Sequence, residues 1–322
     1  MKQYLLYLGL FIIGGLILFL ILSDFFSDSV KRSTGNPWAL ELDDHASIDP
    51  DMIRFAEKKR IRTSNDHPVA IDYAEGKLAI AYQSSIQVID TTGTEIFLNN
   101  TENENTCIAF DPDGMIFLGS DSLILQYSPS GESLDTWAIG EEDVILTAFA
   151  FKNDLLFAAD AGNKVVYRID DNGRILNAID GTGRVQNDFG FILPSPYFDL
   201  EVDQDDQLWV TNTGLLQVEN FSDEGALRAY WGKPSFELEG FLGCCNPVHI
   251  AILPDGSFVT SEKGIVRIKV YQPSGELDAV VAAPQAFDKD SQPPDLAVDE
   301  AGRIFVLDVS RAMIRIFERK ST

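Results

Sequence analysis

The stretch from Phe241 to Ala283 reads FLGCCNPVHIAILPDGSFVTSEKGIVRIKVYQPSGELDAVVAA, and it decides the fold. A short apolar strand, HIAIL, leads to a Pro-Asp-Gly turn. The segments FVTS and IVRIKVY then follow as a second and a third strand. A further turn, PSGE, starts a fourth strand, LDAVVA. Four short strands bounded by turn residues predict one small antiparallel sheet.

The same pattern occurs six times between Pro68 and Lys320. Equivalent positions in successive units lie 39, 41, 51, 50 and 46 residues apart, at Ala70, Ala109, Ala150, Glu201, Ala251 and Ala297. Four-stranded units of about 40–50 residues are typical of β-propeller blades. No segment of this region has the length and period of a sizeable helix. The sequence therefore predicts an all-β, six-bladed β-propeller.

The units also resemble a known repeat family. The last unit reads PDLAVDEAGRIFVLD followed by MIRIF, and the fifth reads PVHIAILPDGSFVTSE followed by VRIKVY. These segments are similar to the NHL-repeat β-propellers, and the resemblance covers Pro68 to Lys320. It implies that the first strand of each blade lines a central channel. It also implies that the loops entering the blades share one face with the turns between second and third strands. NHL propellers include scaffolds, ligand binders and a few enzymes, so the resemblance selects no activity.

The sixth unit ends at Lys320 after its third strand, and an open sheet edge would leave backbone groups unpaired. Met52 to Thr63 precede the first unit, and we expect them to supply the missing outer strand. The predicted plan is a transmembrane signal anchor over residues 1–23, a polar tether over 24–51, and a propeller over 52–320 closed by its N-terminal strand.

The anchor is predicted from Tyr4 to Leu22, YLLYLGLFIIGGLILFLIL, which carries no charge. About 18 apolar residues are enough to span a bilayer, and no small-residue cleavage site follows this run. Lys2 precedes it, whereas Lys31 and Arg32 come only after two aspartates. We therefore expect a single-pass membrane protein whose propeller lies on the extracytoplasmic side, periplasmic or extracellular.

The charge balance limits the partners. The chain has 25 Lys and Arg against 50 Asp and Glu, a formal net charge of -25. Such a surface repels phosphate backbones, so nucleic acid is not expected as a partner. Cationic ligands, metal ions and basic protein surfaces remain open.

Candidate site residues gather on the face that carries the long loops 180–197 and 232–247. Alignment of the units places Asp199, His249 and Asp295 at the start of channel strands, with Glu262 and Lys263 at a turn on the same rim. The alternative for the turn acids is that they bond nearby backbone amides. We predict that the following residues bind the ligand: Asn246, His249, Glu262, Lys263, Asp199 and Asp295.

Three cysteines are present, Cys107, Cys244 and Cys245. The Cys244-Cys245 pair has three interpretations: a packed turn, a strained and easily reduced vicinal disulfide, or soft ligands for copper(I) or zinc together with His249. Calcium is the alternative metal, for acids around the channel. No other cofactor is predicted.

The sequence favours a non-enzymatic binding or scaffold role, with a protein or small-molecule ligand on the loop-rich face. One alternative is a metal-binding or redox-linked accessory protein that uses Cys244 and Cys245. Another is a divalent-metal-dependent, lactonase-like hydrolase at the channel mouth. No G-x-S-x-G motif is present, and His45 of the three histidines lies in the tether, which argues against a three-histidine site in the propeller.

Overall fold

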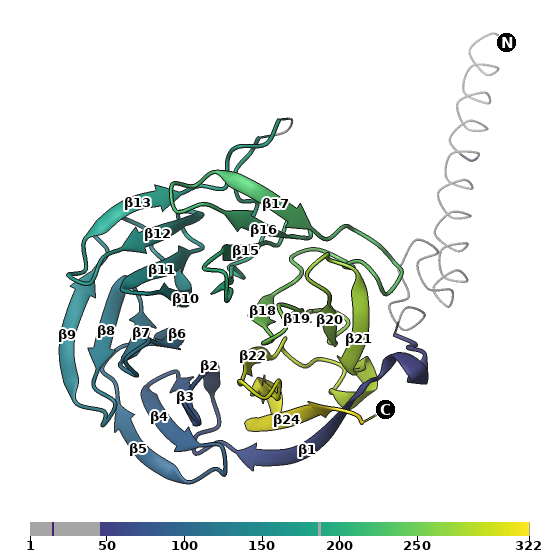
Figure 1. Cartoon of the computed structure of the whole chain (residues 1–322), viewed down its shortest axis with the longest axis horizontal. Coiled ribbons are helices and arrows are strands. Elements are labelled where there is room, and N and C mark those ends of the chain that lie inside the picture. The colour runs from purple at the N-terminus through teal and green to yellow at the C-terminus, as the bar shows by residue number, and fades with distance from the viewer. Residues whose placement is uncertain (1–14, 16–45, 186–187, 322) are drawn as a thin grey trace, which may run out of the picture. The chain divides into compact units, whose positions relative to one another are not determined.

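The computed structural model describes residues 15, 46–185 and 188–321. Six four-stranded antiparallel sheets surround a central channel, so the predicted all-β, six-bladed propeller is confirmed (Figure 1). The predicted anchor, apart from residue 15, and the tether up to residue 45 lie outside the described residues. Within the part of the chain that is described, no helix is long and apolar enough to cross a membrane.

Each blade presents its first strand to the channel and its second strand behind it. The innermost strands are β2 (Pro68–Ala74), β6 (Asn105–Phe110), β10 (Leu146–Lys152), β14 (Leu200–Val202), β18 (His249–Ile252) and β22 (Asp295–Val298). The second strands are β3 (Lys77–Tyr82), β7 (Ile116–Ser120), β11 (Leu155–Asp160), β15 (Leu208–Asn212), β19 (Phe258–Ser261) and β23 (Ile304–Asp308). Each innermost strand contacts that of the next blade, and β22 contacts β2, so the ring is closed.

The third and fourth strands complete each blade toward the outside. The third strands are β4 (Ser85–Asp90), β8 (Leu123–Tyr127), β12 (Val165–Ile169), β16 (Gln217–Phe221), β20 (Ile268–Tyr271) and β24 (Met313–Arg319). The outer strands are β5 (Glu95–Asn100), β9 (Ser133–Ala138), β13 (Ile175–Ile179), β17 (Leu227–Trp231), β21 (Leu277–Ala282) and β1 (Phe55–Arg62). The described residues also form three short 3-10 helices, η2 (Pro50–Met52), η3 (Pro284–Ala286) and η4 (Val309–Arg311).

The sixth blade combines both ends of the propeller. Strand β1 pairs antiparallel with β24, from Phe55 opposite Arg319 to Arg62 opposite Met313. Glu57 of β1 also binds Arg315 of β24, with 2.8 Å between the carboxylate oxygen and Nη2. The edge of β24 is therefore covered by chain that precedes the first blade.

The hydrophobic core lies between the blades. All residues of β7 and β23 are buried, because both faces of these middle strands pack on neighbouring blades. The outer strands are far more exposed, as in β9. Gly119 in β7 lies opposite Cys107, where a Cβ atom would come within 2.4 Å of the Sγ atom. Cys107 is thus a core residue between the second and third blades.

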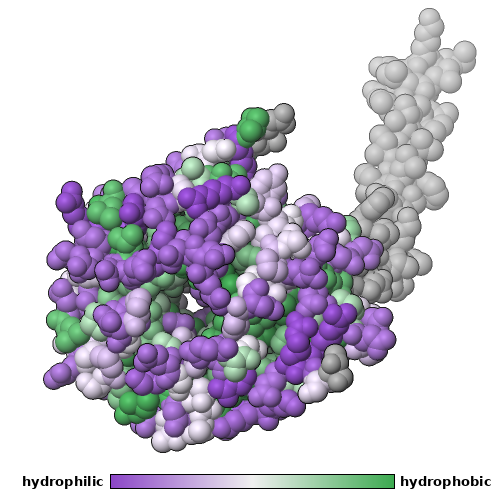
Figure 2. Space-filling view, viewed as in Figure 1, coloured by the Kyte–Doolittle hydropathy of each residue, from purple (hydrophilic) through white to green (hydrophobic). Residues whose placement is uncertain are grey.

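The surface is consistent with the acidic composition. Figure 2 shows hydrophilic residues over most of the visible face of the propeller, with hydrophobic residues in scattered groups and a hollow at the centre of the ring. This central hollow is where the channel strands of all six blades meet.

Candidate functional site

A cavity of about 650 Å³ occupies the mouth of the channel. Its wall comes from the loops that enter the blades and the first residues of the channel strands, including His67, Asn105, Leu146, Tyr197 and Pro293, and from turns between second and third strands. Beneath it lies a narrower cavity of about 50 Å³ between the channel strands. His249 lines both cavities, so it stands where the mouth meets the channel.

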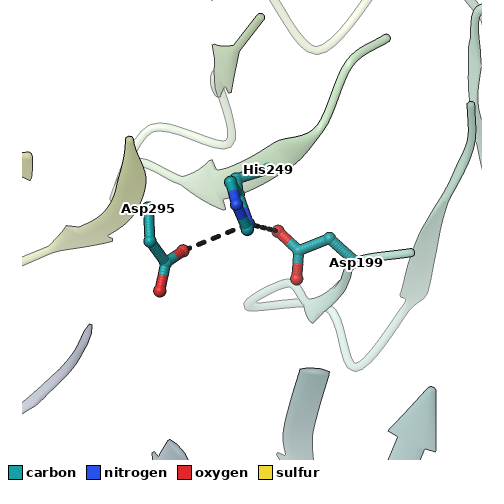
Figure 3. A group of neighbouring side chains, drawn as sticks. All are labelled: Asp199, His249 and Asp295. Atoms are coloured by element: carbon teal, nitrogen blue, oxygen red, sulfur yellow. Dashed lines mark ion pairs between the residues drawn. The ribbon is translucent and has the colours of Figure 1, made fainter. Parts of the chain in front are cut away.

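The imidazole of His249 lies between two carboxylates, as Figure 3 shows. Its Nδ1 atom is 3.3 Å from Oδ1 of Asp295 and 3.5 Å from Oδ2 of Asp199. The three side chains come from three consecutive blades, the fourth, fifth and sixth. Among the described residues, none forms a hydrogen bond with Nε2 of His249, so this nitrogen is available to a ligand.

The two carboxylates are fixed by the backbone of adjacent blades. Asp199 accepts hydrogen bonds from the N–H groups of Leu200 (2.9 Å) and, in the next blade, Ile250 (2.8 Å). Asp295 accepts in the same way from Leu296 (2.8 Å) and from Ile71 of the first blade (2.8 Å). Each carboxylate therefore joins two blades while it orients the histidine.

Two further acids face the channel. Asp72 accepts hydrogen bonds from the N–H groups of Tyr73 and Phe110, the same arrangement one blade further on. Glu201 lies two residues after Asp199 and lines the narrow cavity with Asp72. Of the described residues that line either cavity, none is a lysine or an arginine. In the narrow cavity one imidazole thus faces four carboxyl groups.

The protonation equilibria reflect this crowding. Burial raises the pKa of Asp72 and of Asp295 to about 6, and the neighbouring Asp199 adds to the effect at Asp295. Burial, followed by repulsion from Asp72, Asp199 and Asp295, raises the pKa of Glu201 well above its usual value. Burial alone would lower the pKa of His249, but Asp295 and Asp199 outweigh it and the pKa is raised.

An aromatic ring and a lysine flank the histidine. The ring of Tyr197 meets that of His249 edge to face, with 6.5 Å between centroids. Lys263 lies over the Tyr197 ring at 5.0 Å, and its Nζ atom is 3.4 Å from the hydroxyl of Ser195. Tyr197 therefore contacts both of the predicted residues, His249 and Lys263.

Two other predicted ligand residues are occupied by their own chain. Asn246 is buried and bonds the backbone of Leu242 and Lys263, so it ties the Cys-Cys-Asn-Pro loop to the turn at Lys263. Glu262 is also buried and pairs with Arg267 (2.9 Å) and Lys269 (2.8 Å). The structure places both beneath the rim, in contacts that shape the loop.

The structure does not bring the cysteines to the histidine. Cys244 is exposed, Cys245 is buried with a φ of 66°, and both are unpaired. Within the described residues, the group of His, Cys, Asp and Glu side chains placed to share a metal ion is Asp199, His249 and Asp295. Their ligand atoms lie within 4.8 Å of one another, and neither cysteine belongs to this group.

The other acids of the turns between second and third strands are also bound internally. Asp160 accepts hydrogen bonds from the N–H groups of Ile145 and Gly162, and Asp308 accepts from Arg311 and Arg315. The backbone bonds of Asp160, and the bond from the Arg311 N–H to Oδ1 of Asp308, follow the alternative interpretation, in which the turn acids bond nearby backbone amides.

Sequence reasoning missed Asp72, Glu201 and Tyr197. A signal for Glu201 is present, because residues two apart on a strand point to the same side, so Asp199 and Glu201 both face the channel. Asp72 lies before a two-residue hairpin, Glu75-Gly76, whereas the second, fourth, fifth and sixth units have longer turns, so its strand is out of step with theirs. Tyr197 belongs to a long loop whose course follows from no local pattern.

Comparison with known proteins supports the fold. No family model matches the chain, and no curated protein matches it. Among similar solved structures, a streptogramin B lyase aligns with a TM-score of 0.58 and 12% identity, over 84% of this chain and 100% of its own. The virginiamycin B lyase from Staphylococcus aureus aligns with 0.58 and 13%, over 83% and 100%.

A third structure, a protein of unknown function from Bacteroides thetaiotaomicron VPI-5482, aligns with a TM-score of 0.61 and 12% identity, over 83% of this chain and 72% of its own. These likenesses show the fold alone. They support a six-bladed propeller, and they support neither the NHL family in particular nor a special class with a Cys-Cys-Asn-Pro loop.

Proposed function

We propose that this propeller is a non-enzymatic binding module, and that its ligand is a small molecule with a positively charged group held in the mouth cavity above His249. The observation that carries the proposal is the excess of carboxyl groups in the narrow cavity directly beneath the mouth. Asp72, Asp199, Glu201 and Asp295 face one imidazole, and no lysine or arginine among the described residues lines either cavity. Low-dielectric walls focus such a potential on a bound cation.

The dimensions and lining of the mouth fit a small organic ligand. Cavities of about 300–1,000 Å³ are usual for such ligands, and this one measures about 650 Å³. Its wall combines apolar groups such as Leu146 and Phe198 with the half-buried ring of Tyr197. The ligand we expect is therefore an amine with an apolar body.

The elevated acid pKa values predict how binding depends on pH. A bound cation stabilises the ionised form of Asp295 and Asp72, whose pKa values lie at about 6 without it. Binding should therefore release protons near that pH, and affinity should rise as pH increases from 5 to 7.

A second function is favoured by a specific observation. Asp199, His249 and Asp295 each offer one ligand atom, and these atoms lie within 4.8 Å of one another. This arrangement suits a divalent cation whose remaining coordination positions are open toward the mouth. In that case the protein would be a divalent-metal-dependent hydrolase at the channel mouth. A metal-binding or redox role of Cys244 and Cys245 would be separate from this site.

We further propose that the propeller is held at a membrane by a single-pass anchor and lies outside the cytoplasm. The uncharged run at residues 4–22 and the positions of the flanking basic residues support this. Protease added to cells from which any outer membrane has been removed should then degrade the propeller. A protein that is released in the soluble fraction and stays protected in such cells until they are lysed would contradict the placement.

The binding proposal is tested by thermal unfolding with a panel of primary and quaternary amines, each paired with a neutral isostere. A ligand present at 100 times its Kd stabilises the native state by about 2.7 kcal/mol, so a specific amine should raise Tm measurably. We expect no shift with the isostere and a loss of the amine effect in Asp295→Asn. Stabilisation by calcium, magnesium or zinc alone, with no amine effect, would instead support the hydrolase.

A further inference from the structure

A second groove lies between the second and third blades, at the opposite end of the ring from the mouth. Turns between first and second strands and between third and fourth strands form it, and its volume is about 580 Å³. It shares no lining residue with the mouth or the channel. The groove therefore belongs to a site that the proposed function does not use.

The floor of the groove is aromatic. Phe117 packs against Trp137 and Phe151, with ring centroids 5.6 Å and 4.7 Å apart. Trp137 and Phe151 are half-buried, so the aromatic surface is partly open. Above this floor the lining acids are all aspartates, Asp111, Asp113, Asp154, Asp170 and Asp171. No lysine or arginine among the described residues lines the groove.

Comparison of equivalent turns shows an unused carboxylate oxygen. Asp111, Asp203 and Asp299 begin the same turn, and in each Oδ1 accepts hydrogen bonds from the N–H groups two and four residues later. The surroundings of the second carboxylate oxygen, Oδ2, differ between the three turns. Oδ2 of Asp203 accepts from the indole of Trp209, and Oδ2 of Asp299 accepts from the guanidinium of Arg303. Within the described residues, Oδ2 of Asp111 has no such donor.

The sixth blade shows what fits at this position. There Arg303 binds Asp299 and also lies over the ring of Phe305, with 5.7 Å between Cζ and the centroid. The second blade has the same acid and the same aromatic, Asp111 and Phe117, but its residue at the arginine position is Met115. The acid and the aromatic are therefore present without the cation that binds between them in the sixth blade.

A buried amide provides independent evidence of a ligand. Gln126 lies opposite Phe117 in the sheet, lines the groove and is 7% exposed. Its Nε2 atom is buried, and within the described residues it has no hydrogen-bond partner. A buried amide nitrogen without a partner is unfavourable, so an acceptor from outside the chain is expected to meet it.

We propose that this groove binds an arginine side chain within an extended segment of a partner protein. The guanidinium lies over the aromatic floor and binds Oδ2 of Asp111, as Arg303 does in the sixth blade. Gln126 donates to a carbonyl group of the same segment. The remaining aspartates of the groove attract the cation as it approaches. Burial also raises the pKa of Asp111, which a bound guanidinium would reverse.

The test uses the full chain and an acetylated, amidated peptide, Gly-Ser-Arg-Ser-Gly, with the same peptide carrying citrulline as its neutral isostere. Isothermal titration should show saturable binding of the arginine peptide, about tenfold or more tighter than that of the citrulline peptide. Asp111→Asn keeps the turn acceptor and removes the charge, and it should weaken arginine binding by about tenfold. Gln126→Leu should weaken both peptides.

The matched control is Asp205→Asn, which removes an exposed charge at the corresponding turn of the fourth blade. It should leave affinity within about twofold, while thermal unfolding verifies that each variant is folded. Equal binding of the two peptides, equal effects of Asp111→Asn and Asp205→Asn, or no saturable binding would each overturn the proposal. Because the mouth is not touched, Asp295→Asn should leave peptide binding unchanged.

Discussion

Asp199→Asn tests whether the site carboxylates also hold the blades together. Asp199 uses both oxygens, one for the N–H of Leu200 and the other for the N–H of Ile250 in the next blade. Asparagine has a single acceptor oxygen in its side chain, so one of these two N–H groups loses its partner. Leu200 and Ile250 are both 1% exposed, so water does not replace the lost acceptor.

The structure sets the size of the effect. An unsatisfied buried N–H costs about 1–3 kcal/mol, and the histidine also loses one of its two carboxylate partners. We expect the free energy of unfolding to fall by about 2 kcal/mol. Asp295→Asn should cost a similar amount, because Asp295 makes the equivalent pair of bonds to Leu296 and Ile71.

Urea unfolding followed by tryptophan fluorescence measures both variants, with Asp205→Asn as a surface control expected within about 0.5 kcal/mol of the wild type. A loss of stability in Asp199→Asn no larger than that of the control would refute the reasoning. It would mean that these carboxylates do not join the blades.

Three further predictions concern the histidine, a buried lysine and ring closure. Histidine NMR should show His249 titrating above its usual value of 6.5, and Asp295→Asn should lower that pKa; an unperturbed titration would contradict the pairing. Burial lowers the pKa of Lys269 to about 8, against 10.5 for the free side chain. Between pH 8 and 10.5 the unfolded state therefore binds more protons than the native state, so the free energy of unfolding should rise with pH across that window. Lys269→Met should abolish this rise, and parallel pH profiles of the two proteins would show that Lys269 is not its source. Deletion of residues 52–63 should abolish cooperative unfolding, because β24 loses its partner; a truncated chain that melts like the full one would exclude this role.

The repeat pattern contained most of the information on the fold. Spacing and turn residues predicted six blades of four strands. Successive side chains of a strand point to opposite faces of the sheet, so the sequence of each strand shows a local pattern that repeats from blade to blade. The absent fourth strand of the last unit pointed to residues 52–63, where β1 lies. The uncharged run at residues 4–22 predicts a membrane anchor, but these residues, apart from residue 15, lie outside the described part of the chain.

The site was only partly predictable from the sequence. Alignment of strand starts brought Asp199, His249 and Asp295 together, since equivalent positions in a ring face one axis. Glu262 was expected on the rim, yet it lies beneath loop 232–247 with Arg267 and Lys269. Its burial depends on how that loop folds over the blade, and such long-range packing leaves no periodic signal.

The central claim is that the mouth binds a cation directly above His249. The most direct measurement is the NMR spectrum of ring-labelled histidine, recorded as the amine selected by thermal unfolding is added. We expect the His249 signals to shift in a saturable way as the amine is added, and the neutral isostere of the amine to leave them unchanged. Saturable binding of the amine with no change at His249 would contradict it.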